Sequence, residues 1–246
     1  MGEDREQFVR AVVEAAKPLG IFVSAEAAER MYDHFQLVRE CNEVCGLTSV
    51  VATRDGAVKH YVDSLTVVNV MGDLGVGLGV GRFVDVGSGA GYPGLVVAIQ
   101  LGIGSLALIE ANEKKAGFLA RCVRELRMRG LVVPERAEEV GRGPWRETFD
   151  AALSRAVGGL PSVLEVTAPL VRRGGVVIAM RGRKGVEEAG EAKRAALELG
   201  LEMEKVLRLE LPGGYGERVV LAFQKARSTP EKYPRRSGVP FKRPLT

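Results

Sequence analysis

Apolar residues in the first third of the chain recur every three or four positions, which is the period of an amphipathic α-helix. Ser24 precedes one of these segments in the position of an N-cap, and a further helical pattern covers residues 58–65. The sequence therefore predicts an all-helical N-terminal extension over about residues 3–71. The two clearest stripes are Phe8, Val12, Ala15 and Leu19, and Met31, Phe35, Val38, Cys41 and Cys45.

Beyond the glycine-rich residues 72–81, short apolar segments alternate with amphipathic ones. This alternation predicts a Rossmann-like α/β fold with a seven-stranded, mostly parallel sheet. Only residues 212–216 separate the last two apolar segments, too few for a parallel crossover, so these strands should form a C-terminal antiparallel hairpin. The predicted strands are 82–86, 105–110, 131–135, 149–153, 175–181, 204–211 and 217–225.

The composition fits a protein with one large core. Of the 246 residues, 46% are hydrophobic and 27% are charged, and no segment approaches the roughly 18 uncharged apolar residues of a membrane span. The chain opens with acidic residues instead of a secretion signal, so we expect a cytoplasmic protein with no membrane partner. Three cysteines on predicted helices and only two histidines indicate core packing, with no metal site. We expect a monomer.

The net charge of +4 hides a concentration of basic residues at the C-terminus. From Lys225 to Thr246 there are seven basic residues, one acid and four prolines, which disfavour helix and sheet. Tyr233 and Phe241 lie among these cations, an arrangement suited to binding phosphates and stacking on bases; a solvated, disordered end is the alternative. The predicted organisation is a helical extension at 1–78, a Rossmann-like domain at 79–226 and a basic, proline-rich tail at 227–246.

The first predicted strand runs through an acid into a glycine-rich turn, Asp-Val-Gly-Ser-Gly-Ala-Gly from Asp85 to Gly91. Glycines let a backbone turn tightly and approach a nucleotide-like ligand without a Cβ clash, and Pro93 suits the first turn of the helix that follows. The next strand ends in Glu110, where an acid accepts hydrogen bonds from a ribose diol. A purely structural turn between strand and helix is the alternative.

The acid inside the strand bears on which cofactor binds. A carboxylate two residues before the first glycine would repel a pyrophosphate, whereas S-adenosylmethionine carries an ammonium, a positive sulfonium and no phosphate. Together with the terminal hairpin, this favours a class I S-adenosylmethionine-dependent methyltransferase with Asp85, Gly87 and Gly89 at the cofactor. A further contact is expected from the backbone of Ala137 and the carboxylate of Glu138, although acids there also suit a helix dipole.

Ser154-Arg155-Ala156 follows the fourth predicted strand, where the substrate enters this fold. The chain has here neither the Asn/Asp-Pro-Pro-aromatic motif of enzymes that methylate exocyclic amines nor the cysteine of those that methylate pyrimidine carbon. Guanine N7 fits better, because its in-plane lone pair needs no base and catalysis then reduces to alignment. Arg155 is the catalytic candidate, as a donor to guanine O6 or phosphate; a surface ion pair is the alternative.

Six motifs along the chain occur in a shared order and spacing: Gly46-Leu47-Thr48, Lys59 to Ser64, Asp85 to Gly94, Lys114 to Leu119, Ser154-Arg155-Ala156 and Tyr233 to Pro240. Across essentially its full length the chain resembles the bacterial 16S ribosomal RNA guanine-N7 methyltransferases, the RsmG or GidB (glucose-inhibited division protein B) family. The resemblance implies methylation of the guanine conventionally numbered 527, in the 530 loop near the decoding site, with low-level streptomycin resistance on loss of the enzyme. It implies cofactor contacts at Gly87, Tyr92, Ala137, Glu138 and Arg155, with Glu110, Ala111 and Asn112 near the ribose and adenine.

One motif departs from the family, which usually has Asn-Leu-Thr where this chain has Gly46-Leu47-Thr48, so a contact from that asparagine cannot be assumed. The resemblance places His60 and Ser64 at the substrate mouth, although a capped or salt-bridged helix is an equal explanation. Adjacent positions on one helix rarely form a Ser-His-Asp triad, so we reject that interpretation. Further substrate contacts are predicted for the basic residues Arg181, Arg183, Lys184, Arg235 and Arg236.

The leading hypothesis is therefore N7 methylation of a guanine in 16S rRNA or the 30S subunit, by direct in-line transfer without a covalent enzyme intermediate. Two other classes remain open: a methyltransferase for a small molecule, and a catalytically silent RNA-binding protein that keeps the fold. The basic tail argues against the first, and the intact loop from Asp85 to Gly94 argues against the second.

Overall fold

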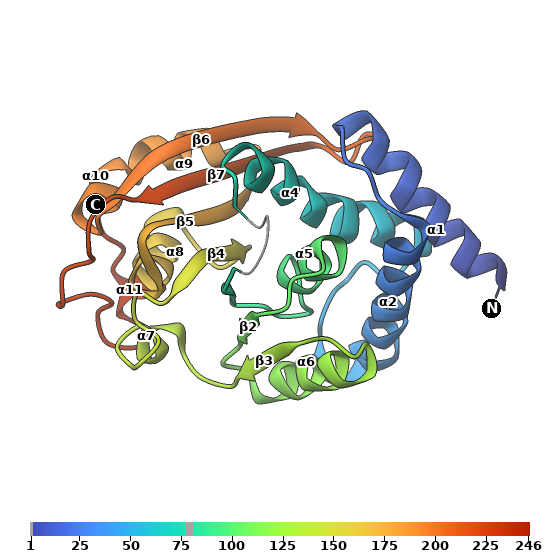
Figure 1. Cartoon of the computed structure of the whole chain (residues 1–246), viewed down its shortest axis with the longest axis horizontal. Coiled ribbons are helices and arrows are strands. Elements are labelled where there is room, and N and C mark those ends of the chain that lie inside the picture. Colours follow the sequence, from blue (N-terminus) through green and yellow to red (C-terminus); the bar gives the residue numbers. More distant parts are fainter. Residues whose placement is uncertain (1, 77–80) are drawn as a thin grey trace.

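The structure is a computed structural model that describes residues 2–76 and 81–246, and a seven-stranded sheet forms its centre (Figure 1). Every strand predicted from the sequence is present in this sheet. The strands are β1 (Phe83–Val86), β2 (Leu106–Ile109), β3 (Gly130–Val133), β4 (Phe149–Arg155), β5 (Val171–Gly182), β6 (Leu201–Glu210) and β7 (Glu217–Lys225).

The strand order is β3-β2-β1-β4-β5-β7-β6. Strand β7 runs antiparallel to both of its neighbours, and the other pairs of strands are parallel. This confirms the predicted mostly parallel sheet with a C-terminal antiparallel hairpin. Strands β5 and β6 begin earlier than predicted, at Val171 and Leu201, because the residues that follow these two include arginine and glycine in β5 and glutamate in β6, which interrupt the apolar signal.

Helices from the first half of the chain cover one face of the sheet. A single apolar cluster joins Phe8, Phe35 and Tyr61 from this region to Phe83 and Leu153 of the strands. The predicted N-terminal extension is thus a layer of the central fold, whereas the predicted boundary at 78/79 lies outside the described residues. These elements are α1 (Gly2–Ala16), η1 (Lys17–Leu19), α2 (Ala25–Cys45), α3 (Thr53–Gly56), the π-helical η2 (Ala57–Val62), α4 (Asp63–Asp73), α5 (Gly94–Leu101) and α6 (Glu113–Glu125).

The opposite face of the sheet is covered by the remaining helices and by the C-terminal tail. A second apolar cluster on this face includes Phe149 and Phe223 of the strands, Leu160 of a helix and Tyr233 of the tail. Figure 1 shows the tail beside the two helices it contacts, α7 and α8. The elements here are α7 (Ala137–Val140), α8 (Leu160–Thr167), η3 (Ala168–Leu170), α9 (Gly185–Glu191), α10 (Lys193–Glu198) and α11 (Val239–Lys242).

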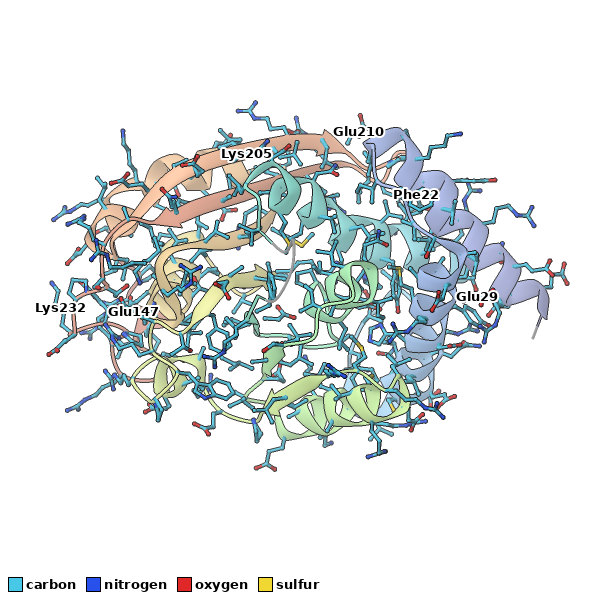
Figure 2. The ribbon with its side chains drawn as sticks, in the orientation of Figure 1. Phe22, Glu29, Glu147, Lys205, Glu210 and Lys232 are labelled. Carbon is cyan, nitrogen blue, oxygen red and sulfur yellow. The ribbon has the colours of Figure 1, made fainter. Side chains whose placement is uncertain are left out.

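The tail is therefore packed, which argues against the alternative of a solvated, disordered end. Tyr233 is only 4% exposed and donates its hydroxyl to Glu198 at 2.6 Å, so its ring is not available to stack on a base. Lys225 is fully buried at the end of β7, where its ammonium donates to the carbonyl of Val171 at 3.2 Å. Lys232, at the outer edge of the molecule in Figure 2, pairs with Glu198.

The N-cap predicted at Ser24 is confirmed. The Ser24 hydroxyl accepts the N–H of Ala27 and so caps α2. Gly46 ends the same helix with φ of 58°, a left-handed conformation that glycine and asparagine adopt most readily. The departure from the family's usual asparagine therefore preserves the helix end.

Among the described residues, no helix has the length and apolar character needed to cross a membrane.

Candidate functional site

Parallel pairing brings three loops to one edge of the sheet. Asp85 on β1 is in register with Leu108 on β2 and with Leu153 on β4. The segments that follow these strands carry the glycine turn, Glu110 and Arg155. The carboxyl ends of parallel strands are where ligands bind in open α/β sheets, so the fold itself assembles the predicted residues.

The glycine turn requires backbone conformations that other residues rarely adopt, and it leaves no space for a Cβ at some of its positions. Gly87, Gly89 and Gly91 all have positive φ, between 55° and 92°. A Cβ on Gly87 would lie 2.5 Å from Cγ2 of Val157, and one on Gly94 would lie 2.6 Å from Cβ of Asp85. Glycine is therefore required where the turn meets its neighbours.

Asp85 lies under this turn and is completely buried. Its Oδ2 accepts the N–H of Gly94 at 3.1 Å, whereas its Oδ1 has no hydrogen-bond partner among the described residues. Burial raises the pKa of this carboxyl to about 7. A buried acceptor without a partner is costly, and this one is suited to a donor supplied by a ligand or a bound water.

Glu110 joins two of the loops. Its Oε2 accepts the N–H of Gly89 at 2.9 Å, and its Oε1 accepts the N–H of Asn112 at 2.8 Å. Each carboxylate oxygen keeps a second lone pair, so the group can still accept hydrogen bonds from a diol. The side chain of Asn112 caps α6 by accepting the N–H of Lys115, so it does not face the cavity.

A cavity of about 380 Å³ opens beside these loops. Five of the ten predicted cofactor residues line it, and so does Phe241 of the tail, which the sequence analysis assigned to RNA instead. The predicted cofactor residues outside this lining are Asp85, Gly89, Tyr92, Asn112 and Arg155. Glu138 is 2% exposed and accepts the N–H of Gly238 at 2.8 Å, so one of its carboxylate oxygens holds the tail. The predicted cofactor residues in its lining are Gly87, Glu110, Ala111, Ala137 and Glu138.

A second cavity, of about 490 Å³, adjoins the first, and the two share Ala156 and Gly158. Its lining is rich in cationic side chains from several elements. Of the residues predicted to meet substrate, it contains His60, Arg155 and Arg181.

A buried carboxylate positions the arginines of this second cavity. Asp63 accepts from Arg155 Nη1 at 3.2 Å through Oδ2 and from Arg218 Nε at 3.1 Å through Oδ1. Arg155 also donates to the carbonyl of Lys59 at 3.4 Å, within the π-helical turn η2. The ion pair considered from sequence thus exists, but it is buried and part of the cavity wall.

Aromatic side chains lie behind these arginines. Cζ of Arg155 is 4.7 Å from the ring centroid of Tyr92, and the ring of His60 stacks on Tyr92 at 4.7 Å. Tyr92 is 5% exposed and supports these groups from below. His60 Nε2 is 2.8 Å from the Thr48 hydroxyl, and burial, aided by Arg155, lowers its pKa to about 4, so its ring is neutral at pH 7.

Of the predicted substrate residues, some bind other groups of the protein and the rest are exposed. Ser64 is fully buried and donates to the carbonyl of His60, so it does not reach either cavity. Arg181 pairs with Glu188, and Arg235 pairs with the fully buried Glu165. The exposed ones are Arg183, Lys184 and Arg236.

The first cavity fits S-adenosylmethionine on the chemistry of its walls. Glu110, in the lining, offers acceptors for hydroxyl groups, and Asp85, buried beneath the glycine turn and outside the lining, has an acceptor without a partner. Carboxylates in these places oppose a phosphate and favour a cationic ligand. Within residues 2–76 and 81–246, no group of three or more metal-ligating side chains is arranged around a common point.

Comparisons with known proteins agree with this geometry. Residues 27–213 match the family model described as rRNA small subunit methyltransferase G. The chain is 40% identical to a ribosomal RNA small subunit methyltransferase G of Carboxydothermus hydrogenoformans, over 92% of this chain and 95% of the relative. It is 34% identical to the protein of that name from Acetivibrio thermocellus, over the full length of both.

Solved structures share the fold at low identity. A methyltransferase of Pyrococcus furiosus superposes with a TM-score of 0.53 and 15% identity, over 81% of this chain and all of that chain. A putative RNA methyltransferase of Pyrococcus horikoshii gives a TM-score of 0.51 and 16% identity, over 67% of this chain and 84% of that chain. At these identities the likeness concerns the architecture alone.

Proposed function

This chain belongs to the rRNA small subunit methyltransferase G family, and on that premise we propose that it methylates N7 of a guanine in 16S rRNA. S-adenosylmethionine is the methyl donor. The target is the guanine conventionally numbered 527, in the 530 loop, presented by 16S rRNA or by the 30S subunit. The protein acts in the cytoplasm as a monomer, and its loss gives low-level streptomycin resistance.

The observation that carries this proposal is the junction of two unlike cavities. The first offers the carboxylate acceptors of Glu110, which suit a cationic donor. The second is lined by Arg155, Arg181 and Arg218, which suit guanine O6 and RNA phosphates. Because Ala156 and Gly158 belong to both cavities, a donor in one and a base in the other meet at this junction.

The bound donor supplies an electrophilic methyl group, and the protein's contribution is orientation. The lone pair of guanine N7 lies in the ring plane and requires no base, so the neutral His60 is not needed for proton transfer. None of the three cysteines lines either cavity in the part of the chain that the structure describes, which favours direct in-line transfer without a covalent intermediate. Accurate alignment alone is worth about 7–11 kcal/mol in favourable systems.

Arg155 is the group we assign to the reacting base. Asp63 and the carbonyl of Lys59 engage only its Nη1, which leaves other guanidinium donors for guanine O6 or a phosphate. The exposed Arg183, Lys184 and Arg236 are assigned to the RNA backbone, where they position the substrate without reading its sequence.

The test is transfer of a labelled methyl group from S-adenosylmethionine to 16S rRNA and to 30S subunits, both from a strain that lacks the enzyme. The modified base is then mapped. N7-methylguanine at position 527 supports the proposal, and the preferred acceptor identifies the substrate. Tight binding of S-adenosylhomocysteine with no transfer to either RNA contradicts it.

A further inference from the structure

The C-terminal tail folds back onto the wall of the first cavity. Phe241, in the short helix α11, lines that cavity together with Gly87, Glu110 and Ala137. Phe241 is 38% exposed, which is unusually high for a large apolar residue in a packed segment. A Cβ on Gly158 would lie 3.0 Å from Cδ1 of this ring, so glycine at the junction makes room for the phenyl group.

Hydrogen bonds on both sides of Phe241 fix the backbone that carries it. Before the ring, the N–H of Gly238 donates to Glu138 at 2.8 Å, and Ser162 donates to the carbonyl of Pro240 at 2.7 Å. After the ring, Arg235 donates to the carbonyl of Arg243 at 2.7 Å. Ring placement therefore precedes ligand binding, and little conformational entropy remains to be lost on contact.

We propose that Phe241 stacks on the adenine of the methyl donor and that the tail is part of the cofactor site. A flat apolar face beside the backbone of Ala137 and the acceptors of Glu110 suits a nucleobase attached to a ribose. The ring lines the first cavity and not the second, so the adenine is its partner and the target guanine is not. This inference rests on the proposed function, because it takes S-adenosylmethionine as the ligand.

The proposal gives Glu138 a structural role in the same site. Glu138 lines the cavity, and its buried carboxylate holds Gly238, three residues before Phe241. The tail that carries the exposed Arg236 and Lys242 is thereby tied to the cofactor pocket. Sequence reasoning placed Phe241 on the RNA because only its cationic neighbours were visible.

The test is calorimetric titration of the full chain with S-adenosylhomocysteine, which needs no RNA. We expect F241A to raise the dissociation constant by about 5- to 100-fold, the range for loss of one base–aromatic stack. F241L, which keeps apolar volume without a π-face, should lose most of the same affinity. K242A is the matched control, because Lys242 is exposed in the same helix and lies outside the cavity lining; its affinity should stay within twofold.

F241W provides a readout that does not depend on removing the ring. The chain has one other tryptophan, Trp145, so the fluorescence of the wild-type protein supplies the baseline. We expect S-adenosylhomocysteine to quench the added indole, with a dissociation constant near that of the wild-type protein. Wild-type affinity in both F241A and F241L, or no quenching in F241W despite calorimetric binding, overturns the inference and leaves the proposed function standing. If the wild-type protein itself does not bind S-adenosylhomocysteine, the result contradicts the proposed function and not this inference alone.

Discussion

The guanidinium of Arg155 lies over the ring of Tyr92, with Cζ 4.7 Å from the ring centroid. This contact links the end of β4 to the glycine turn. The Tyr92 hydroxyl donates to the Tyr61 hydroxyl at 3.2 Å. The Tyr61 hydroxyl in turn lies 2.9 Å from Nδ1 of the buried His34. The N-terminal helices therefore support the site from behind, which explains why they share a core with the sheet.

We expect R155K to lower methyl transfer to rRNA by at least about tenfold, since a desolvated cation–π contact is worth about 2 kcal/mol. Lysine keeps the charge but lacks the planar group that lies on Tyr92 while donating to Asp63. Single-turnover rates measure the effect. R172K is the matched control, because Arg172 pairs with Asp150 outside both cavities. Equal rates for the two variants would contradict a role for Arg155 in transfer.

Asp85 should make the stability of the free protein fall with rising pH. Its pKa is raised from 3.8 to about 7, so its contribution is fully present below pH 3.8 and is lost as the pH rises through about 7. D85N keeps an acceptor for Gly94 but cannot ionise. Urea unfolding measures the free energy of unfolding of both proteins. We expect the value for D85N, relative to that of the wild-type protein, to rise by about 1–3 kcal/mol between pH 5 and pH 8.

The same variant should bind the donor less well. An amide lacks the charge that attracts the ammonium of S-adenosylmethionine, and we expect the dissociation constant of D85N to rise about tenfold or more at pH 8. Titration calorimetry measures it. A protein that is more stable and yet binds with unchanged affinity would show that Asp85 shapes the turn without meeting the ligand.

The fold and the first cavity were predictable because their signals are local in the sequence. The loop from Asp85 to Gly91 and the acid Glu110 each follow an apolar strand, and parallel pairing brings such strand ends together without further information. The C-cap at Gly46 is local in the same sense. Helix caps, strand ends and glycine turns depend on a few consecutive residues.

The remaining features depend on pairs distant in the chain. Glu165 and Arg235 lie 70 residues apart, and Asp63 and Arg218 lie 155 apart. A charged side chain is expected to be exposed until its buried partner is known, and so both Arg235 and Arg236 were predicted to contact RNA. The position of Phe241 in the first cavity could not be predicted for the same reason, because no local pattern reveals that α11 returns to that cavity.

Gly94 should tolerate no side chain. A Cβ there would lie 2.7 Å from Oδ2 of the buried Asp85, where neither group has room to move. We expect G94A to lower the free energy of unfolding by about 1–3 kcal/mol, the usual cost of overpacking. The control is G190A, since nothing lies within 4 Å of a Cβ at Gly190 in α9. Equal melting temperatures for the two variants would contradict the close approach.

Two consecutive arginines in the tail should separate stability from RNA binding. The guanidinium of Arg235 forms two hydrogen bonds to the fully buried Glu165, at 2.8 and 2.5 Å, and the Arg235 N–H donates a third at 2.9 Å. Arg236, in contrast, is exposed. R235A leaves the buried Glu165 carboxylate without its cation and with only the backbone N–H of residue 235 as a donor, so we expect the free energy of unfolding in urea to fall by about 3–5 kcal/mol. Adding E165Q to R235A should recover part of this loss, because no charge then remains buried.

R236A removes the same charge from the same segment and should change stability by less than about 0.5 kcal/mol. Its effect should appear in binding to 16S rRNA, where losing one phosphate contact lowers the slope of log K against log salt by about 0.7–0.9. Because the two variants are matched in net charge, a general electrostatic effect would weaken RNA binding equally in both folded proteins. A stability loss in R236A, or none in R235A, would mean that the tail is not anchored through Glu165.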